Sequence, residues 1–173
     1  MLLVICGRSG CGKTTVAREM QRHGYVAVSA SQIAAQMFVS EYGYEPTRRD
    51  LAEFGTQILT SSREEEYMFR VLNNVLGVDK VVVEGLRSIR TVECLQVNYS
   101  AVVVLMTRSI VMPQSGVGSI DEVDIELHQL ISEVDSYLDT LDFRPDIIVD
   151  NDESVRETCS TIFHRVNEVV CRR

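Results

Sequence analysis

The chain has 173 residues, of which 17 are Lys or Arg and 25 are Asp or Glu, giving a net charge of −8 at pH 7. This length suffices for one α/β domain with a full core. The acidic balance disfavours a protein whose main task is holding a nucleic-acid backbone, although it is compatible with a local basic pocket. The five cysteines form no C-x-x-C or Cys/His cluster, which predicts a reduced intracellular protein rather than a disulfide framework.

An apolar run, a glycine-rich loop and a helix open the sequence. Residues 2–6 predict a buried parallel strand, and residues 7–14 read G-R-S-G-C-G-K-T, a complete P-loop (Walker A) signature. Residues 13–22 continue as a helix, for which Gly24 is the expected stop. Strand, loop and helix in this order are the context that distinguishes a phosphate site from a glycine-rich turn that binds nothing.

The loop has the residue types that a polyphosphate requires. Its glycines let the backbone approach the anion without an intervening Cβ, and its N–H groups and the positive helix end face the charge. Lys13 is expected to reach the β- and γ-phosphates, Thr14 to bind Mg²⁺ and Thr15 to contact the α-phosphate. The cofactors predicted are therefore ATP, or GTP in its place, and Mg²⁺. The expected nucleotide-binding residues here are Gly7, Ser9, Gly10, Cys11, Gly12, Lys13, Thr14 and Thr15.

Strands and helices are expected to alternate along the rest of the chain, which favours a parallel sheet with helices on both faces. The further strands are expected at about residues 25–28, 80–84, 101–106 and 146–149. The further helices are expected at about residues 32–41, 48–60, 64–76, 90–97, 121–139 and 153–170. We predict an α/β P-loop NTPase three-layer fold, with a five-stranded parallel sheet and a small lid. Residues 1–173 are interpreted as one domain, with an acceptor-binding helical insertion at about 30–77 and the lid at about 108–140.

Two charged residues follow the third expected strand, in the run V-V-V-E-G-L-R of residues 81–87. Ligands of open α/β sheets bind outside the carboxyl ends of the strands. Glu84 is therefore expected to hold Mg²⁺, directly or through water, or else to act on the acceptor; a solvated turn residue is the alternative. Arg87 can reach the transferring phosphoryl group or an acceptor phosphate, and a surface arginine is the alternative there.

An arginine pair begins the helix that Thr47 is expected to cap. Cations near the positive end of a helix dipole are unfavourable without an anion. We therefore expect Arg48 or Arg49 to bind the phosphate of an acceptor. The alternative is pairing with one of the neighbouring carboxylates, which belong to Glu45, Asp50 and Glu53.

Three further candidates follow the other strands. Ser29, after the second strand, is expected to contact an acceptor base or sugar, unless it only caps a helix. Arg108 ends the fourth strand, begins the expected lid and is expected to offset transition-state charge. Residues 109–143 hold no Lys or Arg and eight Asp or Glu, whereas a phosphoryl-transfer lid usually brings arginines over the phosphates. Asn151, after the fifth strand, is expected to line the nucleotide base.

These motifs resemble those of small P-loop kinases of the nucleoside-monophosphate-kinase-like group. Residues 24–29 (G-Y-V-A-V-S), 43–48 (G-Y-E-P-T-R) and 81–87 are similar to segments of an archaeal family of adenylate-kinase- or dephospho-coenzyme-A-kinase-like ATPases. The strand end from Glu84 to Arg87 also resembles phage deoxynucleoside-monophosphate kinases and relatives that phosphorylate hydroxymethylated bases in DNA. The resemblance covers about residues 1–108, and Glu84 stands where an aspartate is usual.

Residues and resemblance together predict a cytoplasmic enzyme that moves the γ-phosphate of ATP to a small phosphorylated acceptor, with a nucleoside or deoxynucleoside monophosphate favoured. The expected catalytic residues are Lys13, Glu84, Arg87 and Arg108. One alternative is a kinase of hydroxymethylated bases in DNA, which the charge of −8 disfavours. Another is an ATP-binding switch or assembly protein with little kinase activity, which the arginine-poor lid favours. No membrane contact is expected, because no apolar run approaches spanning length.

Overall fold

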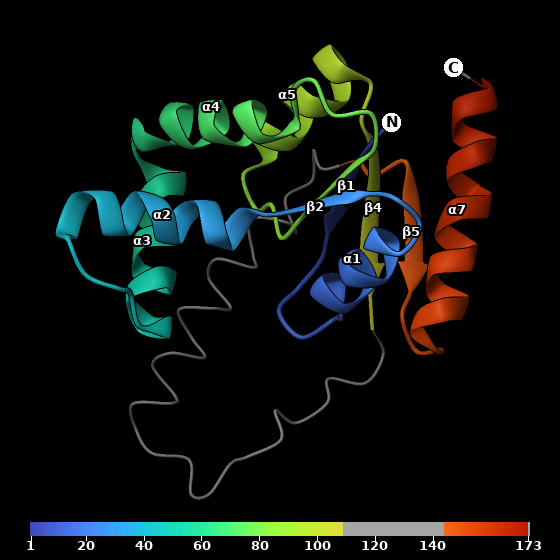
Figure 1. The fold of residues 1–173 in the computed structure, drawn as a ribbon, viewed down its shortest axis with the longest axis horizontal. Coiled ribbons are helices and arrows are strands. Elements are labelled where there is room, and N and C mark those ends of the chain that lie inside the picture. Colours follow the sequence, from blue (N-terminus) through green and yellow to red (C-terminus); the bar gives the residue numbers. More distant parts are fainter. Residues whose placement is uncertain (109–143, 173) are drawn as a thin grey trace, which may run out of the picture.

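The computed structural model describes residues 1–108 and 144–172, and it confirms the predicted parallel sheet between layers of helices (Figure 1). The strand order is β2-β3-β1-β4-β5, and every neighbouring pair is parallel. The strands are β1 (Leu2–Cys6), β2 (Val26–Ser29), β3 (Val81–Glu84), β4 (Val102–Thr107) and β5 (Ile147–Asp150). The P-loop strand β1 therefore lies at the centre, between β3 and β4.

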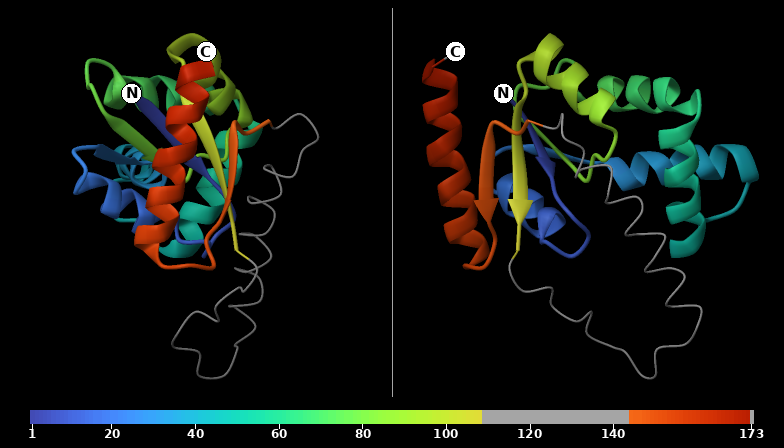
Figure 2. Two further views of the ribbon diagram at one scale, coloured as in Figure 1. Left: turned by 90° about the vertical axis from the view of Figure 1, so that its right-hand side faces the viewer. Right: turned by 180° about the vertical axis from the view of Figure 1, so that it is seen from behind.

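Helices cover both faces of this sheet, as the two views of Figure 2 show. They are α1 (Lys13–Gln21), α2 (Ala30–Tyr42), α3 (Arg48–Thr60), α4 (Arg63–Val75), α5 (Ile89–Tyr99) and α7 (Val155–Arg172). The predicted acidic helix at 121–139 and the predicted lid beyond residue 108 lie outside the described residues. In the described part of the chain, no helix is both long and apolar enough to span a membrane.

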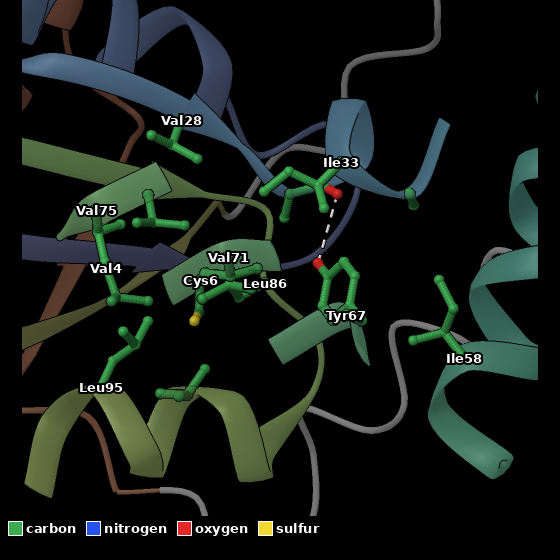
Figure 3. Packing of buried hydrophobic residues seen from close by; sticks show 14 of the residues in the cluster. Val4, Cys6, Val28, Ile33, Ile58, Tyr67, Val71, Val75, Leu86 and Leu95 are labelled. Atoms are coloured by element: carbon green, nitrogen blue, oxygen red, sulfur yellow. Dashed lines mark hydrogen bonds between the residues drawn. The ribbon is translucent and has the colours of Figure 1, made fainter. Parts of the chain in front are cut away.

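Alternation along β1 divides the core into two apolar clusters. Leu3 and Ile5 pack with buried residues of α1 and α7, whereas Val4 and Cys6 pack with residues of α2 to α5 (Figure 3). Successive side chains of a strand point to opposite faces, so one strand supplies both cores. All four side chains are fully buried, which explains the unbroken apolar run in the sequence. Burial raises the pKa of the Cys6 thiol to about 12.

Helices α2, α3 and α4 pack against one another and extend beyond the sheet (Figure 1). Aromatic rings join the first two, because Phe54 of α3 meets Phe38 of α2 edge to face with ring centroids 5.5 Å apart. The guanidinium of Arg63 lies 5.4 Å from the centre of the Phe54 ring and donates to both carboxylate oxygens of Glu41, at 2.5 and 2.8 Å. Arg63, at the start of α4, thus joins α4 to α2 by hydrogen bonds and to α3 by its contact with the Phe54 ring.

The boundaries differ from the sequence prediction mainly around β2. Tyr25 was expected in the strand, but its N–H donates to the Met20 carbonyl at 3.3 Å and so belongs to the turn after α1. The first bond toward β3 comes from the N–H of Val26 to the Lys80 carbonyl, at 2.8 Å. Helix α2 begins earlier than expected, and Ser29 makes no side-chain capping bond; its hydroxyl lies 3.0 Å from that of Ser31 instead.

The N-terminus of α3 confirms the predicted cap. The Thr47 hydroxyl accepts a hydrogen bond from the Asp50 N–H at 3.2 Å, and the Asp50 carboxylate accepts one from the Thr47 N–H at 2.8 Å. This reciprocal pair is a capping box, which satisfies two backbone donors at the helix start. The hydrogen bonds from Thr47 lower the pKa of the Asp50 carboxyl.

Replacing Thr47 by Ala is expected to lower the free energy of unfolding by about 1 kcal/mol, the usual effect of losing an N-cap hydroxyl. Urea unfolding of the wild type, Thr47→Ala and the matched Thr47→Ser variant measures this. Because the folded-state pKa of Asp50 is depressed, its contribution is present above the unfolded-state pKa and is lost as pH falls through the folded-state pKa. The difference between wild type and Thr47→Ala should therefore shrink in acid. An equal loss in Thr47→Ser would contradict the capping role.

Candidate functional site

Three segments that carry predicted site residues meet at the carboxyl edge of the sheet. Ile5, near the end of β1, pairs in register with Glu84 at the end of β3, and Ser29 of β2 pairs with the other side of Glu84. The P-loop leaves β1 at this same edge and leads into α1. Parallel strands bring their carboxyl ends to one edge, so residues far apart in the sequence surround one site.

Two P-loop glycines are fixed by close approach of the rest of the protein. Gly7 has a φ of +144°, and a Cβ there would lie 2.4 Å from the carbonyl oxygen of Met106 in β4. Gly12 has a φ of +94°, and a Cβ there would lie 2.3 Å from Nδ2 of Asn151. Both contacts are shorter than any side chain tolerates. The motif glycines are therefore required by packing around the loop as well as by the expected approach of a phosphate.

Lys13 is buried inside the curl of the loop, although it is the first residue of α1. Its ammonium donates to the carbonyl oxygen of Arg8 at 2.7 Å and contacts Sγ of the buried Cys11 at 3.8 Å. The loop thus holds a positive charge among its own backbone groups. Thr15 and Gly10 lie exposed on the same segment, the former in the first turn of α1.

The side chain of Asn151 braces the P-loop from β5. Its Nδ2 donates to the Cys11 carbonyl at 2.8 Å, and its Oδ1 accepts from the Thr158 hydroxyl of α7 at 2.7 Å. Asn151 is 6% exposed, so its amide is committed to the protein on both sides. The sequence analysis assigned this residue to the nucleotide base. The structure gives it a supporting role beneath the loop, and contact with a base stays a prediction.

The predicted metal-binding pair is brought together. The Thr14 hydroxyl donates to Oε2 of Glu84 at 3.3 Å, and Glu84 is 6% exposed. A hydroxyl beside a buried carboxylate offers the hard oxygen ligands that Mg²⁺ prefers. Within the described residues, no group of three or more His, Cys, Asp or Glu could hold a metal. Mg²⁺ is generally bound by one or two protein oxygens together with substrate phosphates, and the Thr14 hydroxyl and the Glu84 carboxylate are oxygens of this kind.

A cavity of about 320 Å³ lies between the P-loop and the helices α2 and α3. Ser9 of the P-loop, Arg48 of α3 and Arg87 of the loop after β3 all line it. Among the lining residues that the structure describes, these two arginines are the charged ones, and no carboxylate accompanies them. A chain of net charge −8 therefore presents a positive cavity beside its P-loop.

The adjacent arginines at the start of α3 have different surroundings. Arg48 lines the cavity, whereas Nε of Arg49 donates to Oε1 of Glu53 at 2.9 Å, one helical turn away. The pairing alternative thus describes Arg49, and the anion-binding alternative is compatible with Arg48. Ser31 lines the cavity, while Ser29 lies at its rim, hydrogen-bonded to Ser31.

The loop that carries Arg87 is fastened at its next residue, a contact that the sequence analysis missed. The Ser88 hydroxyl accepts from the Thr91 N–H at 3.0 Å, which caps α5, and donates to Oε1 of Glu64 in α4 at 2.6 Å. Ser88 is 1% exposed. A serine three residues before Thr91 is a signal for the cap, but nothing local indicates Glu64.

Tyr67 of α4 lines the cavity and bonds to α2. Its hydroxyl donates to the Ala30 carbonyl at 3.4 Å, drawn as the dashed line in Figure 3. Burial raises the pKa of Tyr67 well above its usual range; the positive charge of Arg87 opposes the shift and the carboxylate of Glu84 adds to it. The charges of Glu84 and Arg87 thus both act on the pKa of Tyr67, a side chain that also lines the cavity.

Arg108 follows β4 at the same edge of the sheet, half-buried. Its Nε is buried and has no hydrogen-bond partner among the residues that the structure describes. The sequence analysis assigned it a catalytic role at the start of the lid, and that role stays a prediction.

The strand order, the P-loop and the parallel sheet define a P-loop NTPase fold of the kind found in small-molecule kinases. Solved structures confirm the fold: a shikimate kinase from Aquifex aeolicus (15% identical, TM-score 0.57, 98% of each chain covered) and a dephospho-CoA kinase from Campylobacter jejuni (15%, 0.56, 96% of this chain and 97% of that one). A gluconokinase from Sinorhizobium meliloti is similar as well (14%, 0.57, 96% and 91%).

Sequence comparison adds two partial matches. Residues 2–78 match the model of an AAA domain. A UPF0200 protein from Pyrobaculum aerophilum is 32% identical over 97 residues, which are 55% of this chain and 51% of that protein. The match thus spans about half the length of that curated relative. The finer assignment to the nucleoside-monophosphate-kinase-like group stays a prediction.

Removing the side chain of Asn151 should loosen the P-loop. Asn151→Ala leaves the buried Cys11 carbonyl and Thr158 hydroxyl without their partner, which costs about 1–3 kcal/mol for an unsatisfied group. We expect lower stability in urea and weaker binding of a fluorescent ATP analogue. Thr158→Val removes the hydrogen bond from Thr158 to Asn151 and keeps the one from Asn151 to the P-loop. This variant is the matched control and should affect ATP binding less. Unchanged ATP affinity in Asn151→Ala would contradict the bracing role.

Glu84→Gln tests the metal pair, because it keeps the shape of the side chain and removes its charge. The gain in ATP affinity that Mg²⁺ produces is expected to fall by about tenfold or more, as for losses around other metal sites. Calorimetric titrations with ATP, in Mg²⁺ and in EDTA, measure this gain. Lys13→Ala is the comparison, since it should weaken ATP binding in both buffers. An undiminished Mg²⁺ effect in Glu84→Gln would exclude Glu84 from the metal site.

Proposed function

We propose that this protein is an ATP- and Mg²⁺-dependent phosphotransferase acting on a small phosphorylated acceptor, with a nucleoside or deoxynucleoside monophosphate as the favoured acceptor. The observation that carries the proposal is the arrangement of two sites at one sheet edge. The P-loop with its buried Lys13 and the Thr14–Glu84 pair forms one, and the cavity of Arg48 and Arg87 forms the other. The shared fold of the similar solved kinases supports a phosphotransferase and does not select the acceptor.

Positioning and electrostatics would supply the catalysis. Lys13 and the loop N–H groups would stabilise the β- and γ-phosphate oxygens of the donor, and Thr14 and Glu84 would hold Mg²⁺, whose chemical contribution would be to neutralise charge on those oxygens. Arg48 binds the acceptor phosphate, for which a guanidinium offers a two-pronged hydrogen-bonding edge. Arg87 offsets charge as an acceptor oxygen attacks the γ-phosphorus and the bond to ADP breaks. Holding donor and acceptor side by side removes most of the entropic barrier.

The helical segment at about 30–77 is proposed as the acceptor-binding insertion. Helices α2, α3 and α4 all fall within it, and they supply most of the cavity lining. Anchoring of all three by Arg63 supports an insertion that behaves as one unit.

The two alternative functions make different demands on the molecule. A kinase of hydroxymethylated bases in DNA requires a basic stripe leading to the site, and the net charge of −8 disfavours it. An ATP-binding switch requires only the P-loop, and its support is the absence of Lys and Arg from residues 109–143. Turnover that depends on an acceptor distinguishes the proposed kinase from the switch. The identity of that acceptor, a small monophosphate or DNA, distinguishes it from the DNA kinase.

The test is MgATP-dependent ADP release across a panel of nucleoside monophosphates, deoxynucleoside monophosphates, dephospho-coenzyme A and hydroxymethylated DNA. We expect turnover with a small monophosphate and its loss in Lys13→Ala. Arg48→Ala should raise the acceptor KM by about tenfold or more, the effect of losing a charged hydrogen bond. The neighbouring Arg49→Ala is the matched comparison and should raise it less. Silence across the panel with intact ATP binding would overturn the proposal in favour of the switch.

A further inference from the structure

The hydrogen-bonding groups of the acceptor cavity are largely committed to the protein itself. The Tyr67 hydroxyl donates to the Ala30 carbonyl at 3.4 Å, and the Ser88 hydroxyl donates to Glu64 at 2.6 Å. The Ser31 hydroxyl lies 3.0 Å from that of Ser29. Among the lining residues that the structure describes, no Asn, Gln, His, Asp or Glu is present. Apart from Arg, Lys, Ser and Thr, those are the side chains that read the hydrogen-bonding edge of a nucleobase.

The remaining wall is aliphatic. Leu51, Ile58 and Leu59 line it from α3, with small residues of α2 and α3 beside them. In Figure 3 the side chain of Ile58 points from α3 toward the ring of Tyr67, which lies on α4. Burying an apolar surface against this wall would contribute about 25 cal/mol per Å² without any directional contact.

Gly55 is a position of α3 at which a side chain would enter the cavity. It lines the cavity, and a Cβ built there would meet nothing within 4 Å. Its φ lies outside the left-handed region, so a larger residue is compatible with the backbone. A side chain at this position would occupy cavity space without displacing any neighbouring atom at its first carbon.

From these observations we infer that the acceptor is a phosphomonoester whose phosphate is recognised by Arg48 and Arg87 and whose body, among the residues that the structure describes, is recognised by apolar contact with α3. Bases that differ in their hydrogen-bonding edges are then used alike, and a monophosphate with an aryl or aliphatic body of similar size is accepted as well. The inference rests on the proposed function, and it deepens that function by naming how the acceptor is selected. An apolar site discriminates between related molecules by about a hundredfold at most, whereas a hydrogen-bonding site reaches about 10⁴-fold.

The experiment compares AMP, CMP, GMP, UMP and phenyl phosphate, in binding by calorimetry and in MgATP-dependent ADP release. We expect the affinities and the kcat/KM values to spread over about a hundredfold or less, and Arg48→Ala to weaken all five alike. A preference of about 10⁴-fold for one base would overturn the inference and leave the phosphotransferase intact. Binding of all five through Arg48 without ADP release would overturn the phosphotransferase and leave the mode of recognition intact. Binding of none would overturn the inference.

Gly55→Leu tests the location independently of substrate choice. Leucine is a better helix former than glycine, so the variant should unfold at the same or higher urea concentration and bind ATP normally. Every monophosphate should bind at least about tenfold more weakly, because the leucine side chain fills the part of the cavity that the body of the ligand would occupy. Gln57→Leu places the same residue on the exposed side of α3 and is the matched control. Unaltered binding in Gly55→Leu would place the acceptor elsewhere.

Discussion

The hold of Asn151 on the P-loop is the interaction on which the rest of the site depends. A phosphate-binding loop directs its N–H groups toward the ligand, so its carbonyl groups must find partners on the other side. The buried amide of Asn151 supplies one of them at Cys11, and Thr158 fixes that amide in turn. The loop is therefore tied to β5 and α7, at the opposite edge of the sheet from β2 and the helix α2 that follows it. The P-loop and the cavity are thus supported by different halves of the molecule.

Local patterns were sufficient to predict the P-loop, the Thr47 cap and the order of strands and helices. The pairing of Thr14 with Glu84 was also predictable, because both follow strands whose carboxyl ends must share an edge. The contact between Asn151 and Cys11 joins residues 140 positions apart, and its direction depends on how β5 and α7 pack. Nothing near either residue in the sequence specifies it. The sequence therefore did not predict contacts that depend on how distant elements pack, such as the hydrogen bond from Asn151 to Cys11.

The choice between Arg48 and Arg49 shows the same limit on a smaller scale. Both residues lie in the first turn of α3, and successive helical positions point about 100° apart. The sequence alone does not set the rotation of α3 against the P-loop, so the two arginines were equivalent. Packing of Phe54 against α2 sets that rotation, and one arginine then lines the cavity while the other bonds to Glu53. Which of the two arginine charges faces the cavity is thus decided by the orientation of the helix.

The hydrogen bond from Ser88 to Glu64 has a mechanical consequence. It joins the loop that carries Arg87 to α4, and Arg63 at the start of α4 is bonded to α2 and stacked on α3. A displacement of the three helices toward the P-loop would therefore pull on residues 85–88 as well. The loop that carries Arg87 and the helices that line the cavity are mechanically coupled, so a shift of one is transmitted to the other.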